Sequence, residues 1–304
     1  MSLDTARAVV SPPRETAARH LSSRLSRMPR LRLGLLLAAP LTWLVLVYVV
    51  ALASLLVTAL WTVDSFTGDL DRSTWTLDNI TTVLTESLYR TVTLRTIGIA
   101  TAVTVIDVLI ALPIAFYMAK VASPGRRRFL VIAVLTPLWA SYLVKAYAWR
   151  STLSDGGLLE WLGSPLGLDS PGYGITAVII TQAYIWLPYV ILPIFAGMER
   201  IPDSLLDASS DLGAGAGRTL RSVVLPLLFP AIIAGAIFSF SLTLGDYITV
   251  NIVGGASQML GNLVFTNAGA GNNLPLAAAV ALVPITIMLV FLAAVRRTGA
   301  LDNL

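Results

Sequence analysis

The chain has 304 residues, of which 56% are hydrophobic and only 12% charged, and it contains no cysteine. Soluble domains carry about 25% charged residues, so this composition predicts a membrane protein instead of a soluble one. The net charge of +4 rests on too few charged residues to indicate nucleic-acid binding, and the lack of cysteine excludes disulfides, thiolate metal sites and cysteine nucleophiles.

Residues 1–33 contain seven arginines with scattered serine and proline but no long apolar run, which predicts a basic cytoplasmic tail. The apolar run over 34–61 is too long for the roughly 7–15-residue core of a cleaved signal peptide and predicts a retained first span. His20, the sole histidine, lies in the tail and is assigned no metal.

The rest of the chain, 34–304, is predicted to be an all-α membrane domain with six transmembrane helices. A bilayer core about 30 Å thick requires about 20 apolar residues of helix. Runs of that kind lie at about 34–61, 92–119, 129–149, 174–198, 227–250 and 275–295. With a cytoplasmic N-terminus, 16 of the 21 lysine and arginine residues fall on the inner side, so the positive-inside rule predicts that both termini are cytoplasmic.

The segment 199–226 is the inner connection whose sequence predicts internal structure. Pro202 and Asp203 indicate a helix start, and apolar residues then recur at helical spacing up to Leu212. Gly213, Gly215 and Gly217 are expected to break this helix, and a second helical run begins at Arg218. The segment is therefore predicted to be a short helix, a glycine turn and a second helix leading into the fifth span.

Seven residues of this segment stand at a fixed spacing. They are Asp207, Ala208, Ser209, Gly213, Val223, Leu225 and Pro226. Their order resembles the EAA loop of bacterial ABC importer permeases, with aspartate, serine and valine replacing glutamate, alanine and isoleucine. The resemblance implies a type I ABC importer permease fold in a bacterial cytoplasmic (inner) membrane, and a loop that couples transport to a separate ATPase. If the family resemblance is set aside, the same residues are also typical of an amphipathic surface helix with a glycine C-cap.

Three stretches, 240–255, 260–264 and 135–149, resemble the spermidine/putrescine branch of these permeases. The resemblance implies a polyamine substrate, although ferric iron, thiamine, phosphonates and amino-acid derivatives remain alternatives. Carboxylates and aromatic rings within spans suit a cationic substrate. The candidate path residues are Asp246, Tyr247, Asp107, Trp139, Tyr142 and Trp186. As alternatives, the aromatic residues can belong to an interfacial belt, and Asp107 can pair with Arg95 or Lys145 or bond to neighbouring hydroxyls.

The resemblance also implies an obligate complex. The chain lacks a phosphate-binding Gly-x-x-x-x-Gly-Lys-Ser/Thr sequence, so no enzymatic activity, catalytic residue or bound cofactor is expected, and ATP and Mg belong to the partner ATPase. The implied partners are two ATPase copies, a second homologous permease, an extracytoplasmic substrate-binding protein and membrane lipid. An intramembrane aspartyl protease using Asp107 and Asp246, and a stand-alone channel or secondary transporter, remain competing hypotheses.

Overall fold

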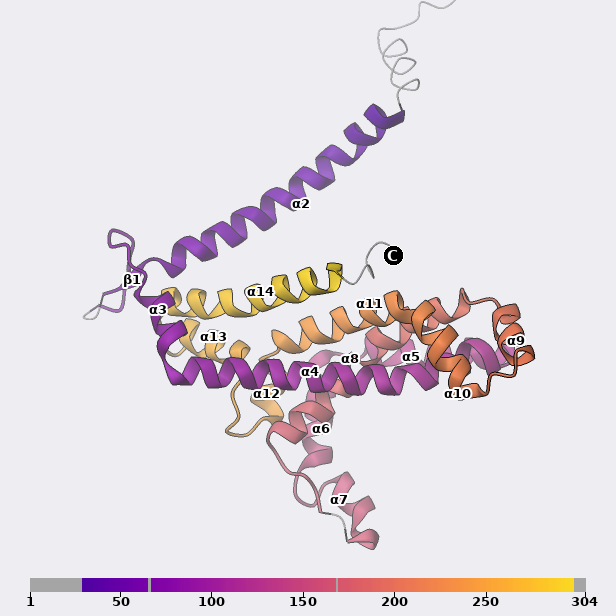
Figure 1. The fold of residues 1–304 in the computed structure, drawn as a ribbon. Coiled ribbons are helices and arrows are strands. Elements are labelled where there is room, and N and C mark those ends of the chain that lie inside the picture. The colour runs from indigo at the N-terminus through magenta and orange to yellow at the C-terminus, as the bar shows by residue number, and fades with distance from the viewer. Residues whose placement is uncertain (1–28, 65–66, 168, 298–304) are drawn as a thin grey trace, which may run out of the picture. The chain divides into compact units, whose positions relative to one another are not determined.

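The computed structural model describes residues 29–64, 67–167 and 169–297, and helices dominate this part of the chain (Figure 1). By internal contacts the chain divides into two units, Met1–Leu55 and Leu56–Leu304. Most of the predicted basic tail, residues 1–28, lies outside the described residues. The first described element is α2, Pro29–Ala59, which begins a few residues before the predicted start of the first span.

Helix α2 supplies the first membrane-spanning candidate. Its segment Leu36–Ala59 has a mean hydropathy of 2.4, and apolar residues surround the whole helix instead of forming one stripe. A helix that is apolar on every side is suited to lipid or to a fully buried position.

A small antiparallel hairpin follows. It consists of β1, Thr62–Val63, and β2, Leu70–Asp71, with Thr62 opposite Asp71. The hydroxyls of Ser73 and Thr74 donate to the Asp71 carboxylate, and these bonds lower the pKa of Asp71 to about 2. The short helix α3, Asp78–Thr85, then leads into the helical bundle.

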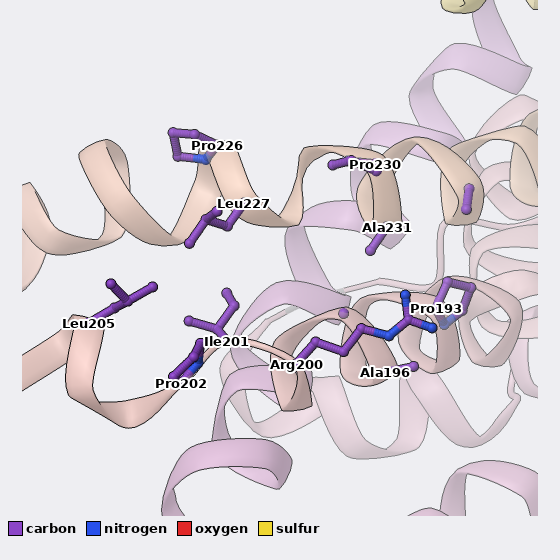
Figure 2. A pocket seen from close by; sticks show the side chains of 12 residues that line it. Pro193, Ala196, Arg200, Ile201, Pro202, Leu205, Pro226, Leu227, Pro230 and Ala231 are labelled. Carbon is purple, nitrogen blue, oxygen red and sulfur yellow. The ribbon is translucent and has the colours of Figure 1, made fainter. Parts of the chain in front are cut away.

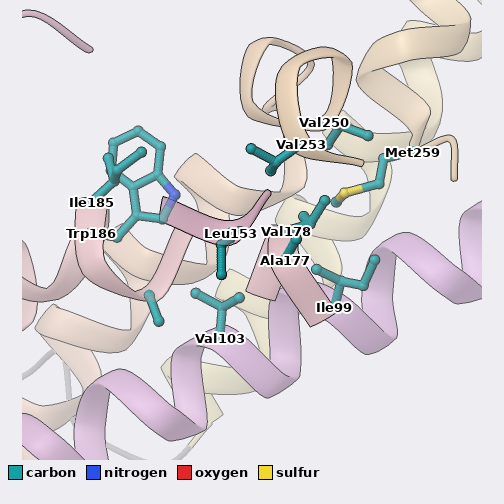
Figure 3. Packing of buried hydrophobic residues seen from close by; sticks show 11 residues of the cluster. Ile99, Val103, Leu153, Ala177, Val178, Ile185, Trp186, Val250, Val253 and Met259 are labelled. Carbon is teal, nitrogen blue, oxygen red and sulfur yellow. The ribbon is translucent and has the colours of Figure 1, made fainter. Parts of the chain in front are cut away.

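Three long helices form the centre of the second unit. They are α4, Ser87–Phe116, which continues as the π-helix η1, Tyr117–Val121; α8, Ile175–Glu199; and α11, Leu225–Leu244. Each packs against the other two. Figure 3 shows one of their buried clusters, in which Ile99 and Val103 of α4 meet Val178 of α8. This apolar packing fixes the positions from which the polar residues described below project.

The third predicted span, 129–149, is divided into two helices. Helices α5, Pro124–Trp139, and α6, Tyr142–Leu153, meet at an angle of 94°. Ala140 between them has an extended backbone conformation, and Ser141 is the N-cap of α6. The short helices α7, Leu158–Gly163, and η2, Ser164–Leu166, follow α6. The predicted span 129–149 is therefore sharply bent between α5 and α6.

The fifth predicted span, 227–250, is displaced towards the N-terminus. A continuous helical segment runs from Ala216 to Leu244 through α10, Ala216–Thr219, the π-helix η3, Leu220–Val224, and α11. Gly245 ends it, and a separate helix α12, Ile248–Val253, follows. The predicted connection before the last span also contains a helix, α13, Leu260–Ala268, which packs on α14, Leu274–Arg297.

The bundle helices α4, α8, α11 and α14 lie lengthwise beside one another in Figure 1. The short helices α9, Asp203–Asp211, and α10 lie at one end of this bundle, and α3 and α13 lie at the other. In the described residues, five helical segments are long and apolar enough to cross a membrane, and the bent α5–α6 pair gives up to six. The predicted helical membrane fold is thus confirmed at this level.

Candidate functional site

The predicted coupling loop, 199–226, forms a helical hairpin at one end of the bundle. Its first arm, α9, starts after Pro202, whose fixed φ and extended conformation set the entry to the helix, and Asp203 lies in the first turn. A carboxylate there interacts favourably with the positive end of the helix dipole. The helix and its start therefore match the prediction from the sequence.

Gly213 ends α9 in a Schellman motif. Its N–H donates to the Ser210 carbonyl at 2.9 Å, and the Ala214 N–H donates to the Ser209 carbonyl at 3.1 Å. Gly213 has a φ of +80°, a left-handed conformation that glycine adopts without the cost of a Cβ atom. Of the three glycines expected to break the helix, Gly213 alone has this conformation, since Gly215 caps α10 and Gly217 lies within it.

The second arm contains the Leu-Pro end of the motif. Leu225 donates its N–H to the Leu220 carbonyl, a bond that spans five residues and widens the helix by one residue at this turn. Pro226 follows directly and has no N–H to donate. The motif residues Val223, Leu225 and Pro226 therefore mark the place where the loop helix joins the fifth span.

The exposed tip of the hairpin offers a surface for a partner. Asp207, Ala208 and Gly213 are exposed, and Leu212 is exposed by 88%, the largest value among the hydrophobic side chains of this hairpin. Ser209 faces the other arm, where its hydroxyl lies 2.8 Å from that of Thr219. The motif thus combines an outward-facing surface with an internal bond that holds the two arms together.

Two apolar cavities flank the hairpin. One, of about 590 Å³, lies between the end of α8, the start of α9 and the start of α11, and Figure 2 shows Arg200, Leu205 and Pro226 among its lining residues. The other, of about 730 Å³, lies between the end of α4 and the second arm, and its lining includes Phe116 and Leu220. The hairpin therefore has apolar space on two sides, where it faces the ends of α4, α8 and α11.

Asp246, a predicted path residue, is 7% exposed and joins several elements. One carboxylate oxygen accepts from the Tyr142 hydroxyl at 2.5 Å and from Gln182 Nε2 at 2.9 Å. The other accepts from the backbone N–H groups of Ile248 and Thr249. These backbone bonds start α12, which explains why the helical segment stops before Asp246 instead of continuing to residue 250.

The predicted aromatic residues separate into two groups. Tyr142 stacks on Trp186 with ring centroids 5.7 Å apart, and the contacts continue through Tyr189 to Phe238. Trp139 is 91% exposed at the break between α5 and α6, and Tyr247 stacks on Phe265. The structure thus joins Tyr142, Trp186 and Asp246 in one polar and aromatic cluster, whereas Trp139 and Tyr247 have other surroundings.

Asp107 is fully buried and lies beside α11. Its Oδ2 accepts from the Ser239 hydroxyl at 2.6 Å, while its Oδ1 has no hydrogen-bond partner in the described residues. The partner is therefore a hydroxyl group, one of the alternatives considered from the sequence, and not Arg95 or Lys145. Asp107 and Asp246 bond to different groups, without the shared contact expected of a catalytic aspartate pair.

Sequence reasoning did not select Gln182, Ser239 or Thr249. Each is a buried, uncharged polar residue in a helix, and each lies within hydrogen-bond distance of Asp107, Asp246 or Tyr142. Buried polar groups require partners. A search for uncharged polar residues within the predicted spans would have found them, whereas a search for charged and aromatic residues did not.

The helical bundle, its apolar spans and its exposed hairpin define a membrane transport permease. The chain belongs to the family described as "Binding-protein-dependent transport system inner membrane component", which matches residues 16–299. It is therefore a multi-pass inner-membrane ABC permease, and the family is one of transport components, not enzymes. The protease and stand-alone channel hypotheses have no support from this membership.

Two curated relatives indicate the branch. The chain is 43% identical over 291 residues to the inner membrane ABC transporter permease protein YdcU of Escherichia coli (strain K12), covering 91% of this chain and 92% of the relative. It is 31% identical over 222 residues to the spermidine/putrescine transport system permease protein PotB of Haemophilus influenzae (strain ATCC 51907 / DSM 11121 / KW20 / Rd), covering 71% and 77% of the two chains. The resemblance to the polyamine branch is thereby confirmed.

Solved structures support the fold. A chain of a bacterial alginate ABC transporter, crystallised in complex with an alginate-pentasaccharide-bound periplasmic protein, superposes with a TM-score of 0.62 at 16% identity, covering 85% of this chain and 92% of that one. A chain of the inward-facing MetNI methionine ABC transporter gives a TM-score of 0.53 at 16% identity, covering 68% and 92%. At these identities the likeness concerns the fold alone.

Proposed function

We propose that this chain is one of two homologous permease subunits of a polyamine importer and that a separate ATPase drives it through the hairpin 199–226. The observation that carries the coupling role is the exposed, internally bonded hairpin, whose residues match the spacing of the coupling motif. A compact hairpin transmits a rigid-body displacement that a flexible loop would absorb.

The proposed topology has six spans with both termini in the cytoplasm. The bent pair α5–α6 counts as one span, and the hairpin then lies on the same side as the cluster Lys120, Arg126, Arg127 and Arg128. Basic residues favour the cytoplasmic side. In this arrangement the complex contains two ATPase copies that hold ATP and Mg, a second permease and an extracytoplasmic substrate-binding protein, whereas this chain binds no cofactor.

Two observations support a polyamine as the substrate. Relatives named for spermidine and putrescine transport cover most of the chain at 31–32% identity. Tyr142 and Trp186 also stack beside the Asp246 carboxylate, a combination suited to an ammonium group. Because Asp246 already accepts four protein donors, we propose that substrate reaches it only after the Tyr142 or Gln182 bond opens. Trp139, Tyr247 and Asp107 remain secondary path candidates.

The test is uptake of radiolabelled putrescine and spermidine into proteoliposomes that contain this chain, the second permease, the ATPase and the binding protein. Uptake is expected when ATP is supplied to the complete complex. No uptake is expected in a preparation that lacks the ATPase. Uptake by this chain alone would favour a channel. If ferric iron, thiamine or a phosphonate competes and polyamines do not, the substrate assignment is wrong while the coupling assignment stands.

A further inference from the structure

The four basic residues after α4 fall into two pairs with different surroundings. Arg126 and Arg128 are exposed, and within the described part of the chain their side chains make no hydrogen bond or ion pair. Lys120 and Arg127 instead bond to several elements. The positive-inside rule explains a basic surface but not these specific contacts, so Lys120 and Arg127 require a separate explanation.

Lys120 connects α4 to the joint between α8 and α9. Its Nζ donates to the Ile201 carbonyl at 2.6 Å and to Asp203 Oδ1 at 2.7 Å. The Lys120 side chain is 10% exposed, whereas that of Asp203 is 79% exposed, so the bond to the buried Ile201 carbonyl is the better protected of the two. A nearly buried ammonium is costly to leave without partners, which makes this connection hard to break.

Arg127 connects α5 to the ends of α4 and α8. Its Nε donates to the Met118 carbonyl at 3.1 Å and its Nη2 to the Ala119 carbonyl at 2.6 Å. Its Nη1 bonds to Glu199 Oε1 at 3.0 Å. Carbonyls in the last turn of a helix lack partners within that helix, and the planar guanidinium can satisfy several of them at once.

Direct packing between α9 and the bundle is limited. Leu206 contacts the buried cluster formed by the ends of α4 and α8, but the two cavities described above lie on either side of the hairpin. The polar contacts of Lys120 therefore supply much of the attachment of α9 to α4. Arg127, on α5, bonds both the end of α4 and Glu199, the first residue of the hairpin 199–226, so it attaches α4 and α5 to the hairpin.

We propose that Lys120 and Arg127 are positioning residues that make α4 and α5 follow α9 when the ATPase displaces it. This inference rests on the proposed coupling role of the hairpin. The hairpin is joined through the chain itself to α8 and α11. Lys120 and Arg127 would carry its displacement to α4 as well, the helix that contains Asp107. Arg126 and Arg128 have no part in this attachment.

The experiment measures distances between pairs of spin labels in the complete transporter. This chain has no cysteine, so labels can be placed on it without first removing thiols of its own. Ser204 on α9 is exposed, and Leu109 on α4 and Leu289 on α14 are exposed by 63% and 62%. The distance from 204 to 289 reports movement of α9, and the distance from 204 to 109 reports whether α4 moves with it.

On ATP binding, the 204–289 distance is expected to shift by about 2 Å or more while the 204–109 distance stays constant. In Lys120→Met and in Arg127→Gln, the 204–109 distance is expected to shift as well. Lys120→Arg, which keeps the charge and the donors, should restore a constant distance, and Arg126→Gln serves as the matched control. Arg127→Gln keeps the test available if Lys120→Met fails to insert.

Two results would overturn the inference and leave the coupling role of the hairpin standing. If the 204–109 distance shifts on ATP binding in the natural chain, or stays constant in both Lys120→Met and Arg127→Gln, then these residues do not make α4 follow α9. A 204–289 distance that never responds to ATP would instead contradict the coupling role of the hairpin, and the inference would fall with it.

Discussion

At the scale of single residues, the backbone conformation at position 213 restricts which residues can replace Gly213, whereas the space around it does not. Its φ is +80°, and a Cβ atom built there would meet no atom within 4 Å. We expect Gly213→Ala to reduce ATP-driven uptake about tenfold, because an ordinary residue in the left-handed region costs about 1–2 kcal/mol. Gly213→Asn should retain more uptake, since asparagine tolerates this conformation better than alanine.

Uptake per ATP hydrolysed in proteoliposomes checks this prediction. Asparagine is larger than alanine, so a requirement for space would reverse the order of the two variants. Lower uptake for Gly213→Asn than for Gly213→Ala would therefore show that docking space, and not the turn conformation, decides the effect.

Asp246 combines a structural role with the proposed role in the path. Asp246→Asn places amide hydrogens opposite Tyr142 or Gln182, both of which donate to this carboxylate. We expect a loss of about 1–3 kcal/mol in stability, typical of an unsatisfied buried group, measured as a lower thermal midpoint in lipid nanodiscs. Tyr142→Phe removes one donor and should cost less.

Kinetics separate the two roles of Asp246. If the carboxylate binds an ammonium group, Asp246→Asn raises the KM for putrescine at least tenfold, or about 1.4 kcal/mol, whereas Tyr142→Phe leaves the carboxylate in place and changes the KM by much less. Equal changes in KM for the two variants would indicate that Asp246 acts only by holding α6, α8 and α12 together.

At the scale of helices, α8 and α11 approach each other closely through small residues. A Cβ atom on Gly197 would lie 2.6 Å from the Ala231 Cβ, and one on Gly235 would lie 3.0 Å from Val190. Small residues permit such close approach between helices in membranes. This packing holds the two helices that flank the hairpin in a fixed relation.

We expect Gly197→Ala to lower stability by about 1–3 kcal/mol, because even one methyl group overpacks this contact. Gly98→Ala on α4 is the matched control, since a Cβ there meets no atom within 4 Å. Thermal midpoints in nanodiscs provide the measurement, and Ala231→Gly should rescue Gly197→Ala. A Gly197→Ala protein as stable as Gly98→Ala would show that α8 and α11 do not pack this closely.

At the scale of the whole molecule, the sequence was sufficient for elements with local signals. The apolar runs predicted the long helices, and Pro202, Gly213 and the helical spacing between them predicted α9 and its end. The break in the third span and the end of α11 were missed. Asp246, just after α11, accepts from Tyr142 at the start of α6, 104 residues away in the sequence, and no local pattern contains such a contact.

The contacts of Lys120 and Arg127 were not predicted from the sequence for a related reason. Within the sequence, these residues cannot be distinguished from Arg126 and Arg128, because all four contribute equally to the charge of one short loop. Their partners Ile201, Asp203 and Glu199 lie more than seventy residues further along the chain. Charge counting therefore predicted the side of the membrane but not the contacts.

The bent pair α5–α6 decides the topology of the whole chain. If the pair crosses the membrane, Ser123 before α5 and Asp155 after α6 face opposite sides; if it folds back as a re-entrant loop, they share one side. We expect a membrane-impermeant maleimide to label Asp155→Cys in intact spheroplasts and Ser123→Cys only after permeabilisation, with Ser204→Cys on α9 behaving like Ser123→Cys.

Labelling of this kind separates the two topologies because both positions are exposed and the unsubstituted chain has no thiol to react. If the α5–α6 pair crosses the membrane, the chain has an even number of spans and both termini lie on one side. The hairpin then lies on the cytoplasmic side, which basic residues favour and where an ATPase can reach it. Labelling of Ser123→Cys and Asp155→Cys from the same side would leave five crossings. The N-terminal and C-terminal ends would then lie on opposite sides, and the proposed six-span arrangement would be wrong.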